Sequence, residues 1–536
     1  MVTPSKRRMK RVVGTIALAT LAFSAGSAFA IKQSGEQKDM RLVGHSNLQF
    51  RGAYQPNVIL YPDRKTTMAF IGLHSGQNLP GPLPNPLNGN KLEENGTMIV
   101  DITDPAHPVD MFHIPVPVKG GQAQMARMCL GSDLPGGVPG KVYLLRNIQG
   151  GVDAKTGVAT QLAGYETWDV TDVRKPVFLA AIRNLRSTHK VWWECSTGIA
   201  YMPGSKDATW GQPLWRQSQS MVIVDWSNPA AAPIYIRTFG LVGGQPSGTG
   251  PVPTSLHGAI SAHDHPNAAG KLVSGVDVIG NRVYAAWGVG SNGVMQILNR
   301  QKLLPPAYGG TWSGDRDNPS EADLVAPQVG RLDLSPNQGG HTTMPVFGVA
   351  PKSLQCSNTA CPGVPSPDVR DLVVLTSEAG NCSSQHWGFV IDVSTENSIG
   401  VKQDQWQGPM VLSTLWVNPQ SGEKYPRGNY CLRGQRFGTH STEENFRNPY
   451  YGRLTFTSYF NAGIRAWDIR DPQGAVQAAF YVPAAANNTY MTNNVEVDNR
   501  GYIVIVDRIG NGMDILELTG KAKEIGRPTE GDDDDE

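Results

Sequence analysis

The 536 residues include 47 basic and 46 acidic side chains, which leaves a formal net charge of +1. A chain this close to neutral lacks the basic surface of a protein that binds nucleic acids or anionic membranes. Its 60 glycines, its 39 prolines and its low share of charged residues, 17%, favour short strands and tight turns over long helices.

The first 30 residues have the pattern of a secretory signal peptide. Basic residues gather at positions 6–11, a largely apolar run covers 12–25, and Ala28-Phe29-Ala30 has the small-x-small form that signal peptidase cuts. An uncleaved membrane anchor is the alternative, but Thr, Ser and Gly interrupt the apolar run. We therefore expect cleavage after this segment.

No later stretch approaches the roughly 20 apolar residues of a membrane-spanning helix. We expect residues 31–525 to form one folded domain, without a transmembrane segment after cleavage, in the periplasm or outside the cell. The acidic residues 526–536 are expected to be a disordered tail.

A sequence motif of two apolar strands recurs along the chain. Its second strand commonly ends in Asp, before a turn that often contains Pro. Copies of the second strand and its turn lie at 96–105, 165–172, 221–229, 293–299, 388–393, 463–472 and 512–517. A third strand follows several copies, at 109–114, 177–182, 234–239 and 476–481. With one further strand before each copy, the pattern predicts an all-β fold, a seven-bladed β-propeller of four-stranded sheets.

The seventh copy lies too near the C-terminus to contain four strands. We expect residues 40–50 to complete it, so that strands from both ends of the chain close the ring and remove its exposed edges. Pro-, Gly-, Ser- and Asn-rich stretches separate the copies, and these are expected to be long loop insertions that shape a site. They lie at about 76–95, 203–218, 240–256, 300–325 and 350–368. The recurring Asp is expected to cap the turn that follows it.

Several segments resemble the LVIVD-repeat proteins, a family of exported bacterial propellers. They are residues 96–105, 219–225, 463–472 and 493–502, the last leading into 512–516. The resemblance covers nearly all of the mature chain at the level of the repeat, and it implies the fold and an exported location. The family carries no single assigned activity, so the resemblance implies no catalytic residue. The fourth copy departs from the pattern, since Asn299 stands where Asp is usual.

Six cysteines in an oxidising compartment predict disulfide bonds. Cys356 and Cys361 enclose only four residues in a Pro- and Gly-flanked loop, so we expect them to pair. The remaining pairs are then assigned as Cys129–Cys195 and Cys382–Cys431. No pair has the C-x-x-C spacing of a redox or zinc site, and the sulfurs are therefore interpreted as structural.

Most of the 11 histidines lie just before a repeat copy, where the innermost strand of a blade should begin. These are His45, His189, His263, His265, His341 and His440, with His257 a little before His263. Innermost strands line the central tunnel of a propeller, so their first residues should converge at one mouth. Converging neutral imidazoles can hold iron, copper, manganese or zinc. The sequence therefore predicts a transition-metal site, although a lining that only hydrogen-bonds water is the alternative.

Glu443 and Glu444 follow His440 closely, and Asp264 stands between His263 and His265. These carboxylates could orient the imidazoles or ligate the ion, and we assign Glu443 and Glu444 as candidate catalytic residues. The other histidines are expected to lie at the surface or in packing: His74, His107, His113 and His386.

Two functions fit this pattern. The first is a metal-dependent oxidoreductase or oxygenase that acts on a small organic substrate. Carotenoid-cleaving oxygenases look similar in architecture, because they hold iron with four histidines on a seven-bladed propeller, but this is an analogy without a sequence match. The second is a non-enzymatic scaffold that binds an envelope protein or a saccharide. A scaffold should tolerate alanine at the histidine positions, whereas a metal enzyme should not.

Overall fold

The computed structural model describes residues 36–527, with gaps at 75–80, 151–162, 207–212, 267, 269–271, 274–275, 278, 350–369, 379, 381, 383–384, 395–407, 423–428, 434–435 and 485–488. The expected signal peptide, the predicted Cys356–Cys361 pair and all but the first two residues of the expected tail lie outside the described residues. In the described part of the chain, no helix is long and apolar enough to cross a membrane.

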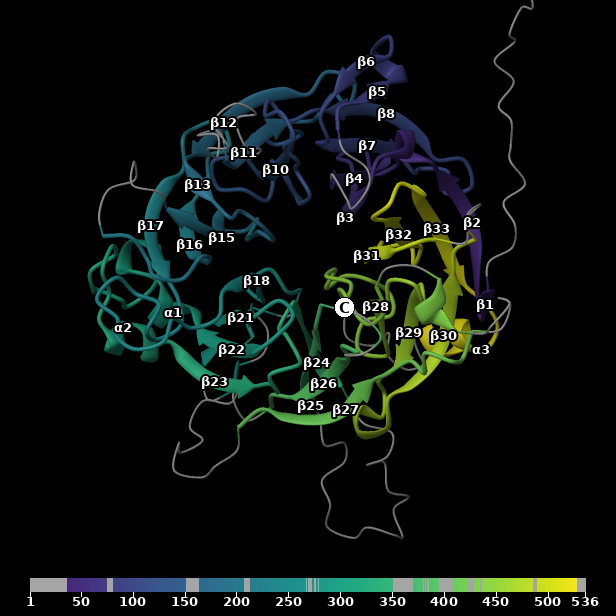
Figure 1. Cartoon of the computed structure of the whole chain (residues 1–536). Coiled ribbons are helices and arrows are strands. Elements are labelled where there is room, and N and C mark those ends of the chain that lie inside the picture. Colours follow the sequence, from purple (N-terminus) through teal and green to yellow (C-terminus); the bar gives the residue numbers. More distant parts are fainter. Residues whose placement is uncertain are drawn as a thin grey trace, which may run out of the picture. The chain divides into compact units, whose positions relative to one another are not determined.

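Seven antiparallel sheets surround a common centre, which confirms the predicted seven-bladed propeller (Figure 1). From the centre outward, blade 1 contains β3 (Ala53–Leu60), β4 (Thr67–Leu73), β7 (Thr97–Asp101) and β8 (Val109–Ile114). Blade 2 contains β9 (Ala126–Leu130), β10 (Val142–Ile148), β11 (Gly164–Asp169) and β12 (Val177–Arg183). Blade 3 contains β14 (Trp192–Trp193), β15 (Ile199–Lys206), β16 (Ser220–Asp225) and β17 (Ile234–Phe239), and β13 (Leu185–Arg186) also pairs with β15.

The next two blades follow the same order. Blade 4 contains β18 (Leu256–Ser261), β21 (Arg282–Trp287), β22 (Val294–Asn299) and β23 (Gln328–Asp333). Blade 5 contains β24 (Thr342–Val349), β25 (Arg370–Thr376), β26 (Gly388–Asp392) and β27 (Met410–Leu415). Two small hairpins lie outside the blade sheets, β5 (Leu83–Asn85) with β6 (Lys91–Glu93) and β19 (Leu272–Val273) with β20 (Val276–Asp277).

Strands from both ends of the chain complete the last two blades. Blade 7 contains β31 (Thr492–Val497), β32 (Ile503–Asp507), β33 (Met513–Leu518) and, outermost, β2 (Met40–Ser46), as the sequence predicts for residues 40–50. Blade 6 contains β28 (Leu454–Ser458), β29 (Ile464–Asp468) and β30 (Val476–Val482), with β1 (Glu36–Lys38) added at its outer edge. The sequence did not predict this second N-terminal strand. The inner side of blade 6 is an irregular segment that bridges β28 through Thr442 and Thr457.

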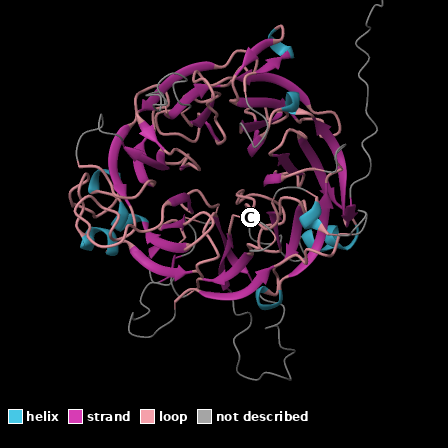
Figure 2. Ribbon diagram, in the orientation of Figure 1, coloured by secondary structure: helices cyan, strands magenta, loops and turns pink. Residues whose placement is uncertain are grey.

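Strands dominate the ring, and the helices are short and lie outside the sheets (Figure 2). They are α1 (Arg300–Leu303), α2 (Glu321–Val325) and α3 (Gly520–Gly526), together with single turns of 3-10 helix. Their small share agrees with the glycine- and proline-rich composition. The insertion expected at 300–325 thus contains two of these helices.

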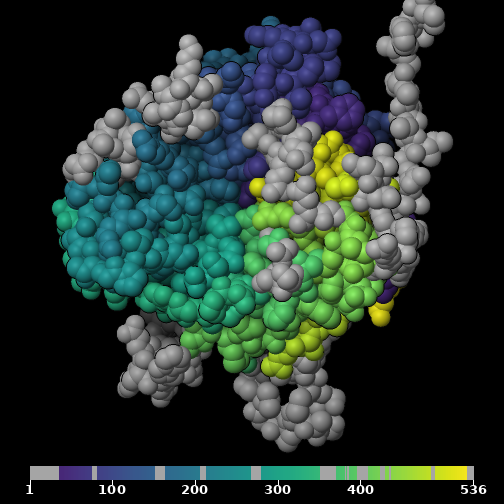
Figure 3. All heavy atoms as spheres, viewed as in Figure 1, coloured from purple at the N-terminus to yellow at the C-terminus, as the bar shows by residue number. Residues whose placement is uncertain are grey.

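Apolar faces between neighbouring blades form the core. Every residue of β4 is buried, because each face of an inner strand packs on a neighbouring blade. Ile71 and Val100 of blade 1 pack with Val504 and Ile515 of blade 7, for example. The space-filling view shows the purple N-terminal part against the yellow C-terminal part at this junction (Figure 3).

The repeated Asp caps the turn after the second strand, as expected. Its carboxylate accepts the backbone N–H two residues later, at 2.9 Å from Thr103 to Asp101 and at 2.8 Å from Ser227 to Asp225. In the atypical fourth copy, Asn299 accepts the N–H of Lys302 at 3.0 Å and caps α1 instead. An amide oxygen replaces the carboxylate there, and the blade keeps its place in the ring.

Two of the predicted disulfides are present. Cys129–Cys195 joins β9 to the turn that follows β14, with 5.5 Å between the Cα atoms, and Cys382–Cys431 joins the segment after β25 to the single 3-10 turn Tyr430–Leu432, with 5.8 Å. The first bond therefore links the innermost strands of blades 2 and 3.

Candidate metal centre and central cavity

The innermost strands all begin at the same end of the tunnel. Tyr54 lies at the start of β3, His189 precedes β14, and His257 lies at the start of β18. His341 directly precedes β24, and His440 begins the inner segment of blade 6. Five blades thus direct aromatic rings to one place, which we call the histidine end of the tunnel.

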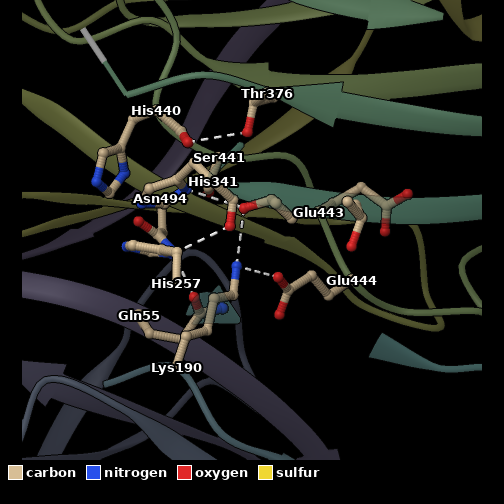
Figure 4. Close-up of polar contacts among 12 residues, drawn as sticks. Gln55, Lys190, His257, His341, Thr376, His440, Ser441, Glu443, Glu444 and Asn494 are labelled. Atoms are coloured by element: carbon tan, nitrogen blue, oxygen red, sulfur yellow. Dashed lines mark hydrogen bonds and ion pairs between the residues drawn. The ribbon is translucent and has the colours of Figure 1, made fainter. Parts of the chain in front are cut away.

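The four imidazoles form a continuous cluster. The ring centroids of His189 and His257 are 4.2 Å apart, those of His257 and His341 are 3.7 Å apart, and those of His341 and His440 are 4.2 Å apart. Tyr54 closes the arc, at 5.4 Å from His189 and 5.2 Å from His440. Figure 4 shows His257, His341 and His440 gathered together although they come from three blades.

Backbone carbonyls fix the orientation of two of these rings. His257 Nδ1 lies 3.0 Å from the carbonyl oxygen of His341, and His440 Nδ1 lies 2.8 Å from that of Asn493. Because a carbonyl only accepts hydrogen bonds, each Nδ1 carries the proton and each Nε2 keeps a free lone pair. Among the described residues, the buried Nε2 of His440 has no hydrogen-bond partner. Metal-ligating histidines are held in the same way.

Glu378, in the loop after β25, adds a carboxylate to the cluster. One ligand atom each from His257, His341 and Glu378 all lie within 4.8 Å of one another. The Glu378 carboxylate also lies 2.8 Å from Arg436 and 3.8 Å from Arg508. These guanidinium groups hold it beside the imidazoles.

Burial keeps the cluster uncharged. Loss of solvent lowers the pKa of His257, His341 and His440 well below the ordinary 6.5, and that of His189 to about 3. The neutral imidazole is the form that ligates transition metals. Imidazole nitrogens with one carboxylate suit iron, copper, manganese and zinc, so these residues fit a metal of the predicted kind.

Hydroxyl and aromatic groups complete the surroundings of the cluster. The Tyr54 hydroxyl lies 3.2 Å from His341 Nε2, and the Tyr54 ring stacks on His74 at 5.9 Å. His74 is therefore a packing residue as expected, but one that packs beside the site. Sequence reasoning missed Tyr54 and Glu378, because neither follows the histidine pattern and Glu378 lies in a loop between repeat strands.

His45 was placed wrongly at the tunnel mouth. It lies on β2, the outermost strand of blade 7, where its Nδ1 is 2.7 Å from Asp514. The segment before the first repeat copy completes the outside of the last blade, so the rule that a histidine before a copy lies inside does not hold there.

His263 and His265 lie at the far end of β18 from the cluster. His263 Nδ1 is 3.0 Å from the carbonyl of Gly280, and the His265 ring packs against Phe347, Phe446 and Tyr451. Their assignment as ligands beside His341 is therefore wrong. The strand begins earlier than the pattern indicated, and His257 occupies the expected position.

The two candidate catalytic glutamates also lie away from the imidazoles. Glu444 pairs with Lys190, as Figure 4 shows, and also with Arg127. Glu443 is buried and accepts the backbone N–H of Asn445 at 3.0 Å. The carboxylate beside the histidines is Glu378, so the expected placement of Glu443 and Glu444 is corrected here. Asp264 accepts backbone N–H groups of Cys195 and Ser196.

A cavity of about 990 Å³ opens at the opposite end of the innermost strands. Its lining comes from the last residues of β3, β9, β14 and β31, from residues 263–266 and Ala268 after β18, and from residues 444–447. Arg127, Glu444 and Glu496 line its base. Lys190 Nζ lies behind them and donates to Thr342 Oγ1 at 2.9 Å, and Thr342 Oγ1 lies 3.0 Å from His341 Nδ1.

No family model matches the chain, and no curated protein matches it. Solved structures with a similar fold include the Dos1 propeller, which is 9% identical over 90% of this chain and 96% of its own, with a TM-score of 0.41. The Cps50 (Swd1) β-propeller domain of Myceliophteria thermophila is 8% identical over 90% and 100%, with a TM-score of 0.43. Sqt1 of Saccharomyces cerevisiae is 8% identical over 91% and 99%, with a TM-score of 0.41. At these identities the comparisons carry no argument about function.

Proposed function

We propose that the protein is an exported β-propeller that holds a transition-metal ion at the histidine end of its tunnel and uses it to catalyse the oxidation of a small organic substrate by dioxygen. The observation that supports a metal is the convergence of four neutral imidazoles and one carboxylate in a buried place. Buried polar atoms are costly unless they are hydrogen-bonded, and His440 Nε2 has no hydrogen-bond partner among the described residues, with the Glu378 carboxylate 3.9 Å away.

His257, His341 and Glu378 would hold the ion, with His440 and His189 beside them. A bound ion would supply Lewis acidity and, if it is iron, copper or manganese, a change of oxidation state. The chain orients the ligands, since carbonyl oxygens fix the His257 and His440 rings. Arg436 and Arg508 hold Glu378 in position.

Export is part of the proposal. The N-terminal pattern of a signal peptide supports it, and so do the disulfides Cys129–Cys195 and Cys382–Cys431, because such bonds persist in oxidising compartments. We also propose that the chain belongs with the LVIVD-repeat propellers. The regular placement of the repeated Asp at five or more strand ends supports that assignment.

Elemental analysis of untagged protein tests the metal. We expect close to one equivalent of one transition metal in wild type and at least a tenfold loss in His341→Ala. His107→Ala is the matched control, because His107 is exposed and pairs with Asp104 on the surface. If His341→Ala does not fold, His440→Gln serves instead. Less than ~0.2 equivalents of any transition metal in folded wild type would contradict the proposal, and zinc alone would contradict its redox part.

The scaffold alternative also has an observation in its favour. Several outer strands begin with an exposed apolar side chain, so that similar positions recur around the rim. They are Val109, Val177, Ile234, Met410 and Val476, each between 54% and 60% exposed. A scaffold that binds an envelope protein or a saccharide would keep its binding after His341→Ala, which separates the two functions.

A further inference from the structure

The Lys190 side chain connects the base of the cavity to the histidine cluster. Its Nζ pairs with Glu444, which lines the cavity, and donates to Thr342 Oγ1 at 2.9 Å. Figure 4 shows the Lys190 side chain pointing toward the Glu444 carboxylate. Its stem packs against Gly258, where an added Cβ would lie only 3.1 Å from Lys190 Cβ. Lys190 is 2% exposed, so these contacts hold its ammonium group in a buried place.

The hydrogen bonds that start at this ammonium group have a direction. An ammonium nitrogen only donates, so Thr342 Oγ1 accepts from Lys190. Thr342 is buried, and the other hydrogen-bond neighbour that the described residues offer its hydroxyl is His341 Nδ1, at 3.0 Å. Because a buried hydroxyl proton without an acceptor is costly, that proton is directed at Nδ1. The positive charge of Lys190 favours the same arrangement, since it attracts the Nδ1 lone pair and repels an N–H group there.

His341 therefore differs from its neighbours in the nitrogen that carries its proton. A neutral imidazole has one ring proton, so acceptance at Nδ1 places the proton of His341 on Nε2. The Tyr54 hydroxyl lies 3.2 Å from this Nε2 and can accept the hydrogen bond. His257 and His440 have the opposite form, because the Nδ1 of each faces a backbone carbonyl. One ring of the cluster thus presents an N–H group where two others present lone pairs.

We propose that Lys190, acting through the Thr342 hydroxyl, positions the proton of His341 on Nε2 and so makes metal loading depend on a proton shift within that ring. The proton position follows from hydrogen bonds of the metal-free protein, whereas its effect on loading rests on the proposed function. An ion at Nδ1 would lie beside the Lys190 ammonium group, so the charge favours Nε2 as the ligand atom. As a bond to Nε2 forms, the proton leaves Nε2, a proton arrives at Nδ1, and the Thr342 hydroxyl turns to accept it.

Nitrogen NMR of the full mature chain with isotopically labelled histidine tests the proton positions, because protonated and unprotonated ring nitrogens differ in chemical shift. After dialysis against a chelator, we expect His341 to carry its proton on Nε2, and His257 and His440 to carry theirs on Nδ1. Contacts with the Thr342 methyl group identify His341 in wild type, so this measurement needs no variant to fold. A proton on Nδ1 of His341 in the metal-free protein would overturn the proposal.

Variants then test the two positioning residues. Lys190→Met keeps a long side chain without its charge, and the share of His341 with the proton on Nδ1 should rise at least tenfold. Thr342→Val should shift the His341 Nδ1 resonance, because it removes the hydroxyl, and Thr342→Ser should restore the wild-type position. Thr343→Val is the matched control, since its hydroxyl donates to the Tyr284 carbonyl at 3.0 Å, and it should change nothing at His341. An unchanged His341 spectrum in folded Lys190→Met or Thr342→Val would refute the assigned role.

Addition of zinc chloride to the same sample separates the proton position from the proposed function. As zinc binds to wild type, we expect the proton of His341 to move from Nε2 to Nδ1, while His257 and His440 keep theirs on Nδ1. Bound zinc with the His341 proton still on Nε2 would overturn the loading step, because His341 would not ligate the ion through that nitrogen. Absence of zinc binding would contradict the proposed metal site and the loading step with it, but not the proton position measured without metal.

Discussion

The two ends of the tunnel are built from the same strands, but the free-energy cost of burying polar side chains is offset differently at each end. At the histidine end, the buried groups are neutral imidazoles whose protons are donated to backbone carbonyls. At the cavity end, the buried groups are formal charges, with Glu444 between Arg127 and Lys190. The innermost strands thus place side chains at both ends of the tunnel. The type of residue at each end determines whether that site offers nitrogen lone pairs or charged groups.

The largest loss of stability should come from removing a buried charge at the cavity end. Glu444→Ala would leave Arg127 and Lys190 buried without their partner, which typically costs about 3–5 kcal/mol of unfolding free energy. Urea denaturation measures this loss. The matched control is Glu517→Ala, whose partner Arg41 is mostly exposed, and a surface pair contributes at most about 1 kcal/mol. Equal losses in the two variants would show that the cavity end is not charge-paired as described.

The two ends should also respond to pH in opposite directions. Buried histidines with lowered pKa values bind fewer protons when folded than when unfolded, so metal-free protein should lose stability as pH falls below 6.5. The pKa of Glu443, raised to about 8, has the reverse effect, since the folded state keeps a proton that the unfolded chain releases. Stability should therefore also fall as pH rises from about 4.5 to 8.

Glu443→Gln separates these effects. It should stabilise the protein at pH 8.5 by up to about 5 kcal/mol and change little near pH 4, where both states carry the proton. Urea denaturation across this pH range measures both values. His107→Gln, at the exposed surface, should leave the whole profile unchanged. A Glu443→Gln profile parallel to that of wild type would contradict the raised pKa.

The smallest effect concerns a single hydroxyl at each end. Tyr54→Phe removes the contact with His341 Nε2, and Tyr61→Phe removes the 2.7 Å bond to the carbonyl of Val170 near the cavity. Each change should cost about 1 kcal/mol. Only Tyr54→Phe should raise metal affinity, because it frees a ligand nitrogen. Calorimetry with one added metal ion distinguishes the two variants, and the opposite order of affinities would refute the role given to His341.

Much of the fold could be predicted because the propeller repeats one short pattern. The third strands at 109–114 and 234–239 and the closing strand within 40–50 follow from apolar runs between turn residues. The strand β1 could not be found this way, since Glu36–Lys38 is short and polar and pairs only because β30 has a free edge. Its place depends on the finished ring.

The site was harder to predict than the fold, because convergence depends on register. His189, His341 and His440 are brought together, but the start of β18 lay earlier than expected, and His257 took the position given to His263. Glu378 and Tyr54 could not be found, since no periodic signal marks a loop carboxylate or a single inner tyrosine. Charge pairing at Glu444 likewise depends on Arg127, which is 317 residues away in the chain.

The pairing of β2 with β33 and of β1 with β30 joins the earliest part of the domain to the latest. A chain made from its N-terminus cannot form either ladder until the final blades exist, so these two strands must wait while the intervening blades fold. A product that stops before β33 would leave β2 with an open, unpaired edge, which is prone to association and proteolysis. These two strand pairs therefore form only in chains that have been made as far as β33, and shorter products keep the exposed edge.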